Sequence, residues 1–373
     1  KKNRGRQKDR FSVKFRQRIK KEKPNMRYPE FLKENGTIGF VAPSFGCSTE
    51  PYRTAFNHAL DKWKKEGYGI DIGPNCYENS GVGISNTPEK CAEELTEWYC
   101  RKGNNILISC GGGELMCEVL PFVDFERIRK ADPKWYLGYS DNTNMTYLLT
   151  TLCDTAAVYG PCAASFGMEP PHESIKDTFA LLRGEKLSFE SYELYEKESL
   201  KSEENPLAPY NCTEPVRSRF FVPDSEGEIK ESSRVYLKGR LLGGCLDCLA
   251  NLSGTEFDKT REFCEAYRED GILWFLEACD LNVFSIRRAL FQLKHTGWFS
   301  HTAGFVFGRS LNGEAMMDLD EAGAVLPVLE EYRVPVILDA DFGHLPPATP
   351  LICGSMAEIG GISGKITISM SLC

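Results

Sequence analysis

Three residues in this sequence have the side-chain types that a serine hydrolase uses. Ser140 lies in the hexapeptide Gly-Tyr-Ser-Asp-Asn-Thr at 138–143, Glu277 ends an apolar run, and His344 follows another. A serine hydroxyl is a poor nucleophile until a base removes its proton. A histidine base in turn needs a carboxylate, which fixes its tautomer and stabilises the imidazolium. In the order Ser, Glu, His, the chain therefore contains the three groups of a nucleophilic triad.

Each of these residues also has a structural interpretation. Ser140 is a suitable N-cap for a following helix. Glu277 could pair with Arg287 or Arg288 of the next helix. His344 could be a loop histidine that is hydrogen-bonded for stability. On the hexapeptide alone, these alternatives stay open.

The hexapeptide differs from the nucleophile elbow of the α/β-hydrolases. That elbow is Gly-x-Ser-x-Gly, and Asn142 stands where the second glycine would be. The departure argues against that particular fold and leaves a different nucleophile turn open.

A run of three glycines, 111–113, follows the apolar segment 105–110. Glycines allow close approach to a ligand, and their N–H groups can hold an oxyanion or a phosphate. The run matches neither common nucleotide-binding glycine motif, and a tight turn between a strand and a helix is the structural alternative. Cys110, beside the run, is another candidate nucleophile, although a thiol that ends an apolar strand is more typical of a buried structural residue.

The cysteines and the other histidines predict no metal or cofactor. Fifteen cysteines without a secretory signal suggest a reducing compartment, and so a cytoplasmic protein with free thiols. Cys245 and Cys248 have CxxC spacing, but no second CxxC completes a four-thiolate zinc site. The histidines at 58, 172, 295 and 301 lie in helices, loops or turns that favour structural roles.

Charge is distributed unevenly. Residues 1–25 carry twelve Lys and Arg and two acidic residues, a net charge of +10, which leaves about −18 on the rest of the chain. The acidic body argues against a broad nucleic-acid surface. The basic segment 1–25 is predicted to be a disordered leader, although it could bind nucleic acid or an anionic surface. No apolar run is long enough to span a membrane.

Strands alternate with helices along most of the chain, which predicts an α/β fold with a mostly parallel sheet flanked by helices. We expect a nucleophile domain at 26–188, a polar linker or excursion at 189–233, and a C-terminal α/β domain at 234–373 whose end is rich in β-structure. Strands are expected at 37–44, 69–74, 105–110, 134–140, 271–277, 304–308 and 335–339, and helices at 55–68, 87–103, 142–153, 243–252 and 285–297.

Several short motifs occur in a fixed order: GTIGFVAPS (36–44), SCGGGELM (109–116), LGYSDNT (137–143), VYGPCAASFG (158–167), GRLLGGCLDCLANLSGT (239–255), LWFLE (273–277) and FGH (342–344). Together they resemble the LD-carboxypeptidase and microcin-immunity family of serine peptidases. The resemblance covers nearly the whole chain after the leader. The length of the excursion and the GGCLD motif look more like the microcin-immunity branch.

The resemblance implies a Ser140–Glu277–His344 triad without metal or cofactor. It also implies an oxyanion hole made by the backbone N–H groups of Gly112 or Gly113 and of Asp141. Family members commonly form homodimers, and the site would lie between the two domains. The implied substrates are a muropeptide ending in D-alanine, or a peptidyl or aminoacyl nucleotide.

The sequence also departs from the family pattern. Glu114 stands where glycine or asparagine is common, so an acid lies beside the expected oxyanion hole. The excursion lacks the tryptophan that the immunity branch often uses to stack a nucleobase, and Tyr192, Tyr195 and Tyr210 are the aromatic residues that could replace it. A non-catalytic two-domain protein that binds a peptide or sugar is the alternative function.

Overall fold

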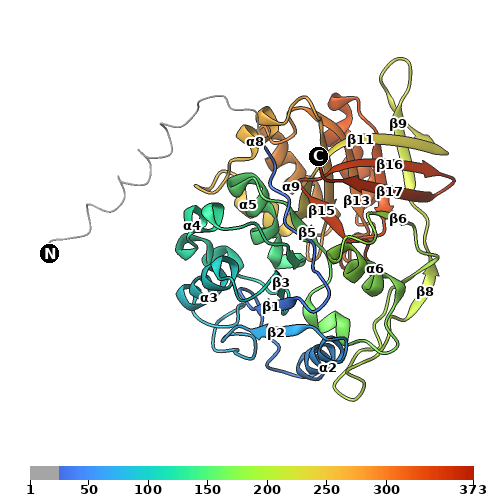
Figure 1. Ribbon diagram of the computed structural model, residues 1–373. Helices are drawn as coiled ribbons and strands as arrows, with labels where there is room; N and C mark the ends of the chain where they lie inside the picture. The colour runs from blue at the N-terminus through green and yellow to red at the C-terminus, as the bar shows by residue number, and fades with distance from the viewer. Residues whose placement is uncertain (1–24) are drawn as a thin grey trace.

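Two β-sheets organise residues 25–373, which are the residues that the computed structural model describes (Figure 1). Except for Asn25, the basic leader lies outside this range. The first sheet has six strands and the second has nine, and a small two-stranded sheet accompanies them. The predicted α/β class, with parallel strands flanked by helices, is confirmed.

The first sheet comes mainly from the first half of the chain, and its order is β15-β5-β4-β3-β1-β2. All pairs are parallel except β15 with β5. Most of its strand residues are buried, as expected for a parallel sheet covered by helices. Its strands are β1 (Thr37–Val41), β2 (Gly69–Ile72), β3 (Ile106–Ser109), β4 (Tyr136–Gly138), β5 (Ala157–Tyr159) and β15 (Leu351–Cys353).

The helices of the first part start and end close to their expected positions. Thr87 caps α3 by accepting the Lys90 N–H, and Pro88 occupies the first helical position. The helices are α2 (Tyr52–Lys65), α3 (Pro88–Cys100), α4 (Phe125–Lys130), α5 (Thr143–Cys153) and α6 (Glu173–Leu182), with 3-10 turns at Met116–Glu118, Leu120–Phe122, Ser140–Asn142 and Ala163–Gly167.

The second sheet has the order β10-β9-β14-β13-β12-β11-β16-β17-β6. Its four central strands, β14 to β11, are parallel, whereas the strands on both sides of them are antiparallel. The strands are β6 (Ser188–Glu190), β9 (Arg219–Pro223), β10 (Ile229–Ser232), β11 (Arg234–Cys245), β12 (Ile272–Glu277), β13 (Thr302–Gly308), β14 (Val336–Ala340), β16 (Met356–Ile362) and β17 (Lys365–Ser371).

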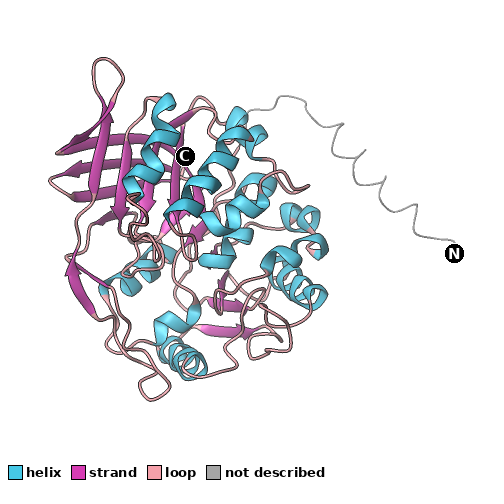
Figure 2. Ribbon diagram, turned by 180° about the vertical axis from the view of Figure 1, so that it is seen from behind, coloured by secondary structure: helices cyan, strands magenta, loops and turns pink. Residues whose placement is uncertain are grey.

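Helices of the second part gather beside this sheet, as Figure 2 shows. Asn282 begins α9 by accepting the Ser285 N–H. The helices are α7 (Leu246–Leu252), α8 (Thr260–Ala266), α9 (Val283–His295) and α10 (Glu321–Leu329), and a 3-10 turn follows at Glu330–Tyr332. Across residues 25–373, no helix has the length and apolar character needed to cross a lipid bilayer.

The polar segment 189–233 is more ordered than a linker. Strands β9 and β10 within it join one edge of the second sheet, and β7 (Leu194–Glu196) pairs with β8 (Cys212–Pro215). The segment is polar because its strands lie at edges and expose part of their residues to water. These short strands therefore could not be predicted from the composition of the segment.

The helix expected at 243–252 begins three residues later, because strand β11 continues to Cys245. Here β11 and β12 approach closely. A Cβ on Gly243 would lie 1.8 Å from the Phe275 carbonyl oxygen, and Gly243 has a φ of +157°. The paired glycines thus belong to the strand, where this close approach leaves no room for a side chain.

Candidate active site

Ser140 lies in the turn that connects β4 to α5. Its φ of +62° is in the left-handed region, which is uncommon for a residue with a side chain and often marks a functional turn. Gly138 makes the turn possible, because a Cβ there would lie 2.8 Å from the Cβ of Asn142. Asn142 is buried and donates a 2.8 Å hydrogen bond to the Gly111 carbonyl. Asn142 therefore ties the serine turn to the glycine turn.

His344 and Glu277 come from the second part of the chain and meet Ser140. His344 lies in the loop after β14, with its Nε2 2.9 Å from the Ser140 Oγ and its Nδ1 2.8 Å from the Glu277 Oε2. An ionised carboxylate can only accept hydrogen bonds, so Nδ1–H donates to Glu277 and Nε2 is left to accept the serine proton. The structure thus brings the three predicted residues together with a triad's hydrogen-bond geometry.

Tyr159 is a residue of this site that the sequence did not reveal. It ends β5, and its hydroxyl donates a 2.5 Å hydrogen bond to the Glu277 Oε1. The same hydroxyl accepts the Ser140 backbone N–H at 3.2 Å. Tyr159 lies in the motif VYGPCAASFG, but nothing in that motif shows a hydrogen bond across the two sheets. One phenol group therefore connects the nucleophile turn to the carboxylate.

The site's electrostatics favour an ion pair between Glu277 and His344. Burial alone would raise the pKa of Glu277, which is fully buried, but the His344 charge and hydrogen bonds from His344 and Tyr159 lower it overall. Burial alone would lower the pKa of His344, but the Glu277 charge and hydrogen bonds to Cys279 and Glu277 raise it well above its ordinary value of 6.5. The carboxylate thus stabilises a proton on the imidazole.

The glycine turn lies directly beside Ser140. A Cβ on Gly112 would be 3.2 Å from the Ser140 Cβ, while one on Gly113 would be 2.1 Å from the Ser44 Oγ. The turn is anchored by a 2.8 Å hydrogen bond from the Phe45 N–H to the Gly112 carbonyl. Within residues 25–373, the N–H groups of Gly112, Gly113 and Asp141 have no hydrogen-bond acceptor. These groups are therefore free to bind a ligand oxygen.

Two acidic side chains beside this turn lie differently. Asp141 is buried and accepts hydrogen bonds from the Ser44 hydroxyl at 2.5 Å and the Met116 N–H at 2.9 Å. Burial raises the pKa of Asp141, although those hydrogen bonds oppose the shift. Glu114 is exposed. The Asp141 carboxylate thus fixes the turn, and Glu114 lies at the surface.

Two family models match this chain. The LD-carboxypeptidase N-terminal domain matches residues 38–160, and the LD-carboxypeptidase C-terminal domain matches residues 238–359. This chain belongs to the LD-carboxypeptidase family. It is therefore a serine peptidase, and its two matched domains carry the two halves of the site described above.

Known relatives span nearly the whole chain. YocD of Bacillus subtilis, named as a carboxypeptidase, is 24% identical over 91% of this chain and 98% of its own. The microcin C7 self-immunity protein MccF of Escherichia coli is 24% identical over 89% and 93%. An MccF structure with glutamyl sulfamoyl guanosine has a TM-score of 0.75 at 21% identity, covering 92% and 98%. The muramoyltetrapeptide carboxypeptidase of Oxalobacter formigenes has a TM-score of 0.65 at 19% identity, covering 90% and 99%.

In this LD-carboxypeptidase family member, Arg309 holds the loop that carries His344. Arg309 follows β13, is 5% exposed and forms a 2.5 Å ion pair with Asp341. Its Nη2 also donates to the carbonyls of Leu345 at 2.9 Å and Pro347 at 3.2 Å, on the far side of His344. Arg309 thus connects both ends of the loop. No local motif marks it, because its partners are formed only by the folded chain.

The helix-cap alternative for Ser140 and the arginine-pair alternative for Glu277 are not seen in the structure, and Asn142 is the residue that precedes α5. Arg287 and Arg288 contact the Gly323 carbonyl and Ser285, and neither of them pairs with Glu277. Cys110 is fully buried, and burial raises the pKa of its thiol well above the ordinary value. A buried neutral thiol is a poor nucleophile. Cys110 therefore fits the structural role that its sequence position favoured.

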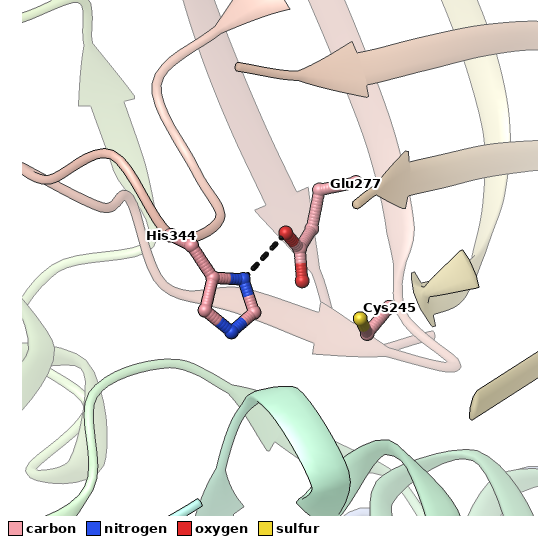
Figure 3. Close-up of side chains that lie close together, drawn as sticks. All are labelled: Cys245, Glu277 and His344. Carbon is pink, nitrogen blue, oxygen red and sulfur yellow. Dashed lines mark hydrogen bonds and ion pairs between the residues drawn. The ribbon is translucent and has the colours of Figure 1, made fainter. Parts of the chain in front are cut away.

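All fifteen cysteines are free thiols, as expected. Two of them nevertheless lie at the site. The Sγ of Cys248 is 3.6 Å from the Ser140 carbonyl oxygen, and Cys245 lies beside Glu277 and His344 (Figure 3). The CxxC spacing in the sequence gave no indication that these thiols reach the serine turn. Their position depends on β11 ending next to β12 and α5.

Proposed function

We propose that this serine peptidase hydrolyses an amide bond near the C-terminus of a peptide-like substrate through Ser140, His344 and Glu277. The observation that carries the proposal is the unbroken hydrogen-bond chain from the Ser140 hydroxyl through His344 to a fully buried Glu277. Membership of the LD-carboxypeptidase family supports it and argues against the alternative of a non-catalytic binding protein.

In the proposed mechanism, the Ser140 Oγ attacks the substrate carbonyl carbon while the His344 Nε2 accepts the hydroxyl proton. Glu277 stabilises the imidazolium that forms. The carbonyl oxygen becomes an oxyanion that the free N–H groups of Gly112 and Asp141 hold, with Gly113 as the other donor of the glycine turn. His344 then donates its proton to the leaving nitrogen, and the C–N bond breaks. Water releases the acyl group from Ser140 by the same steps.

The substrate class separates into two candidates. One is a muropeptide that loses a terminal D-amino acid, and the other is an aminoacyl or peptidyl group joined to a modified nucleotide, as in the ligand bound by MccF.

Phe45 supports the second candidate. The residue is 43% exposed, and its carbonyl oxygen and Cβ would lie 3.2 and 3.6 Å from a Cβ on Gly111, in the turn beside the nucleophile. A flat exposed ring there is suited to stacking on a base.

The tyrosines expected to replace the stacking tryptophan are less suitable. Tyr192 is buried and donates to Asp177, and Tyr195 lies 4.6 Å beneath the Arg309 guanidinium. Tyr210 packs against His172 at 5.5 Å between ring centroids. Homodimer formation and a cytoplasmic location stay predictions of the sequence.

The test is side-by-side turnover of a muramyl tetrapeptide and an aminoacyl sulfamoyl adenosine by the wild-type protein and Ser140→Ala. We expect the wild type to hydrolyse one of them, and Ser140→Ala to lose at least about 10³-fold in kcat. Labelling by a fluorophosphonate probe should disappear in Ser140→Ala. Near-full activity of Ser140→Ala on the preferred substrate would refute the proposed nucleophile.

The role of Phe45 has a separate readout. Phe45→Ala should raise KM for the aminoacyl sulfamoyl adenosine while leaving KM for the tetrapeptide nearly unchanged. An equal effect on both substrates would remove the argument for base stacking.

A further inference from the structure

Three potential metal ligands lie close together next to the proposed nucleophile, Ser140. Cys245, Glu277 and His344 each offer one ligand atom, and these atoms lie within 4.8 Å of one another. Figure 3 shows the sulfur of Cys245 and the imidazole of His344 both beside the Glu277 carboxylate. Within residues 25–373, this is the single cluster of its kind.

The fold places the thiol beside the carboxylate. Strands β11 and β12 are parallel, and Cys245 is the direct register partner of Glu277 at their carboxyl ends. The Cys245 backbone N–H donates to the Thr143 hydroxyl at 3.0 Å, which holds this strand end against α5. Cys245 is 2% exposed and Glu277 is fully buried. The backbone of Cys245 is therefore fixed by the sheet, and its thiol also donates to the Asp247 Oδ2 at 3.2 Å.

We propose that Cys245, Glu277 and His344 form an inhibitory site for a thiophilic divalent cation such as Zn²⁺. Thiolate, carboxylate and imidazole are the ligands that zinc takes in proteins, and three protein ligands leave a fourth position for water. The His344 side chain is 11% exposed, so it is the member of the cluster that solvent reaches most. The inference rests on the proposed function, because inhibition means loss of the His344 base.

The ion inhibits by changing the tautomer of His344. In the active form of the enzyme, with neutral His344, Nδ1–H donates to Glu277 and Nε2 accepts from Ser140. A cation bound to Nδ1 takes the lone pair of that nitrogen, so the single proton of the neutral imidazole moves to Nε2. Nε2 then cannot accept the serine proton. The ion also occupies the carboxylate that would stabilise the imidazolium.

Binding of the ion balances in protons. Starting from neutral His344, zinc bonds to the Cys245 sulfur and to Nδ1, the thiol proton leaves for solvent, and the imidazole proton is relocated to Nε2. One proton is therefore released per ion.

The first test is inhibition of substrate turnover by buffered free Zn²⁺. Wild type should be inhibited reversibly, with activity restored by a chelator. Cys245→Ala should need at least about 100-fold more zinc for half-inhibition, because even loss of an outer partner of a metal ligand costs 10–100-fold. Cys373→Ser, which removes an exposed thiol at the chain end, is the matched control and should behave like wild type. Equal zinc sensitivity of Cys245→Ala and wild type would overturn the proposal.

The second test measures binding without activity. Co²⁺ added to Ser140→Ala should give a thiolate-to-cobalt charge-transfer absorption that disappears in the Ser140→Ala, Cys245→Ala double variant. Absence of that absorption would overturn the metal site, whatever the enzyme hydrolyses. If Ser140→Ala keeps full activity, the proposed nucleophile fails, yet the cobalt spectrum still decides the metal site. The two failures are therefore distinguishable.

Discussion

Glu277→Gln tests the proposed triad with the smallest change of shape. The substitution keeps the size of the side chain but removes the charge that faces His344 at 2.8 Å. Two unit charges about 4 Å apart interact by about 4 kcal/mol in a protein-like environment. Because 1.36 kcal/mol corresponds to a factor of ten in rate, losing this stabilisation of the imidazolium costs about 10³-fold.

A second effect adds to this loss. The glutamine amide can donate to Nδ1, which would place the imidazole proton on Nε2, where it blocks acceptance of the serine proton. A comparable change in a serine-protease triad lowers kcat by about 10⁴-fold. We therefore expect Glu277→Gln to lower kcat by about 10³- to 10⁴-fold.

The assay is steady-state turnover of whichever substrate the wild type hydrolyses. Glu265→Gln is the matched control, because Glu265 also pairs with a histidine, His301, at 2.9 Å. That pair is exposed and far along the chain from the site, so its loss should leave kcat unchanged. If Glu277→Gln kept kcat within tenfold of wild type while remaining folded, stabilisation of the imidazolium by Glu277 would not be the basis of activity.

The other predictions concern the surroundings of the triad. On the acid side of the pH profile, kcat/KM should fall with a midpoint above pH 6.5, because the raised pKa of His344 keeps the base protonated at lower pH. A midpoint below pH 6.5 would contradict the ion pair between Glu277 and His344. Tyr159→Phe removes the hydrogen bond to Glu277 and should lower kcat/KM by about 10- to 100-fold, since a hydrogen bond to a charged group contributes about 1.5–3 kcal/mol. The control is Tyr147→Phe, which loses a buried hydrogen bond to Thr260 and should reduce thermal stability but leave kcat unchanged. Arg309→Met should lower the free energy of unfolding by about 3–5 kcal/mol by leaving Asp341 unpaired. Compared with Arg309→Met, Arg309→Lys should restore more of the stability than of kcat. Equal recovery of both would show that Arg309 acts on stability alone.

The sequence was sufficient to predict the α/β class and the three residues that meet. Each triad residue ends or follows an apolar strand. The carboxyl ends of parallel strands gather at one edge of a sheet, which places Glu277 near His344. The glycine run could be placed beside Ser140 for the same reason. These features are local patterns whose positions in the fold follow from general rules. The meeting of Glu277 and His344 with Ser140, which lies on the other sheet, was implied by the family resemblance.

The residues that the sequence did not reveal depend on contacts between distant segments. Tyr159 reaches Glu277 across 118 positions, and Arg309 reaches Asp341 and Leu345 only after the loop has folded. A buried tyrosine or arginine gives no signal of this kind in its neighbouring residues. The short strands of the polar segment 189–233, which the sequence indicated as a linker or excursion, were not predicted for a related reason: edge strands expose polar residues, so their composition resembles that of a linker.

The site also explains why the two sheets must keep one relative position. Ser140 is supplied by the first part of the chain, and Glu277 and His344 by the second, yet the Ser140 Oγ lies 2.9 Å from the His344 Nε2. Tyr159 connects the parts at the carboxylate, and Thr143 connects them through the backbone of Cys245. Strand β15 contributes a third connection, because it leaves the second part to complete the first sheet. Substrate hydrolysis therefore depends on an interface that the chain crosses several times, so substitutions there should reduce kcat and stability together.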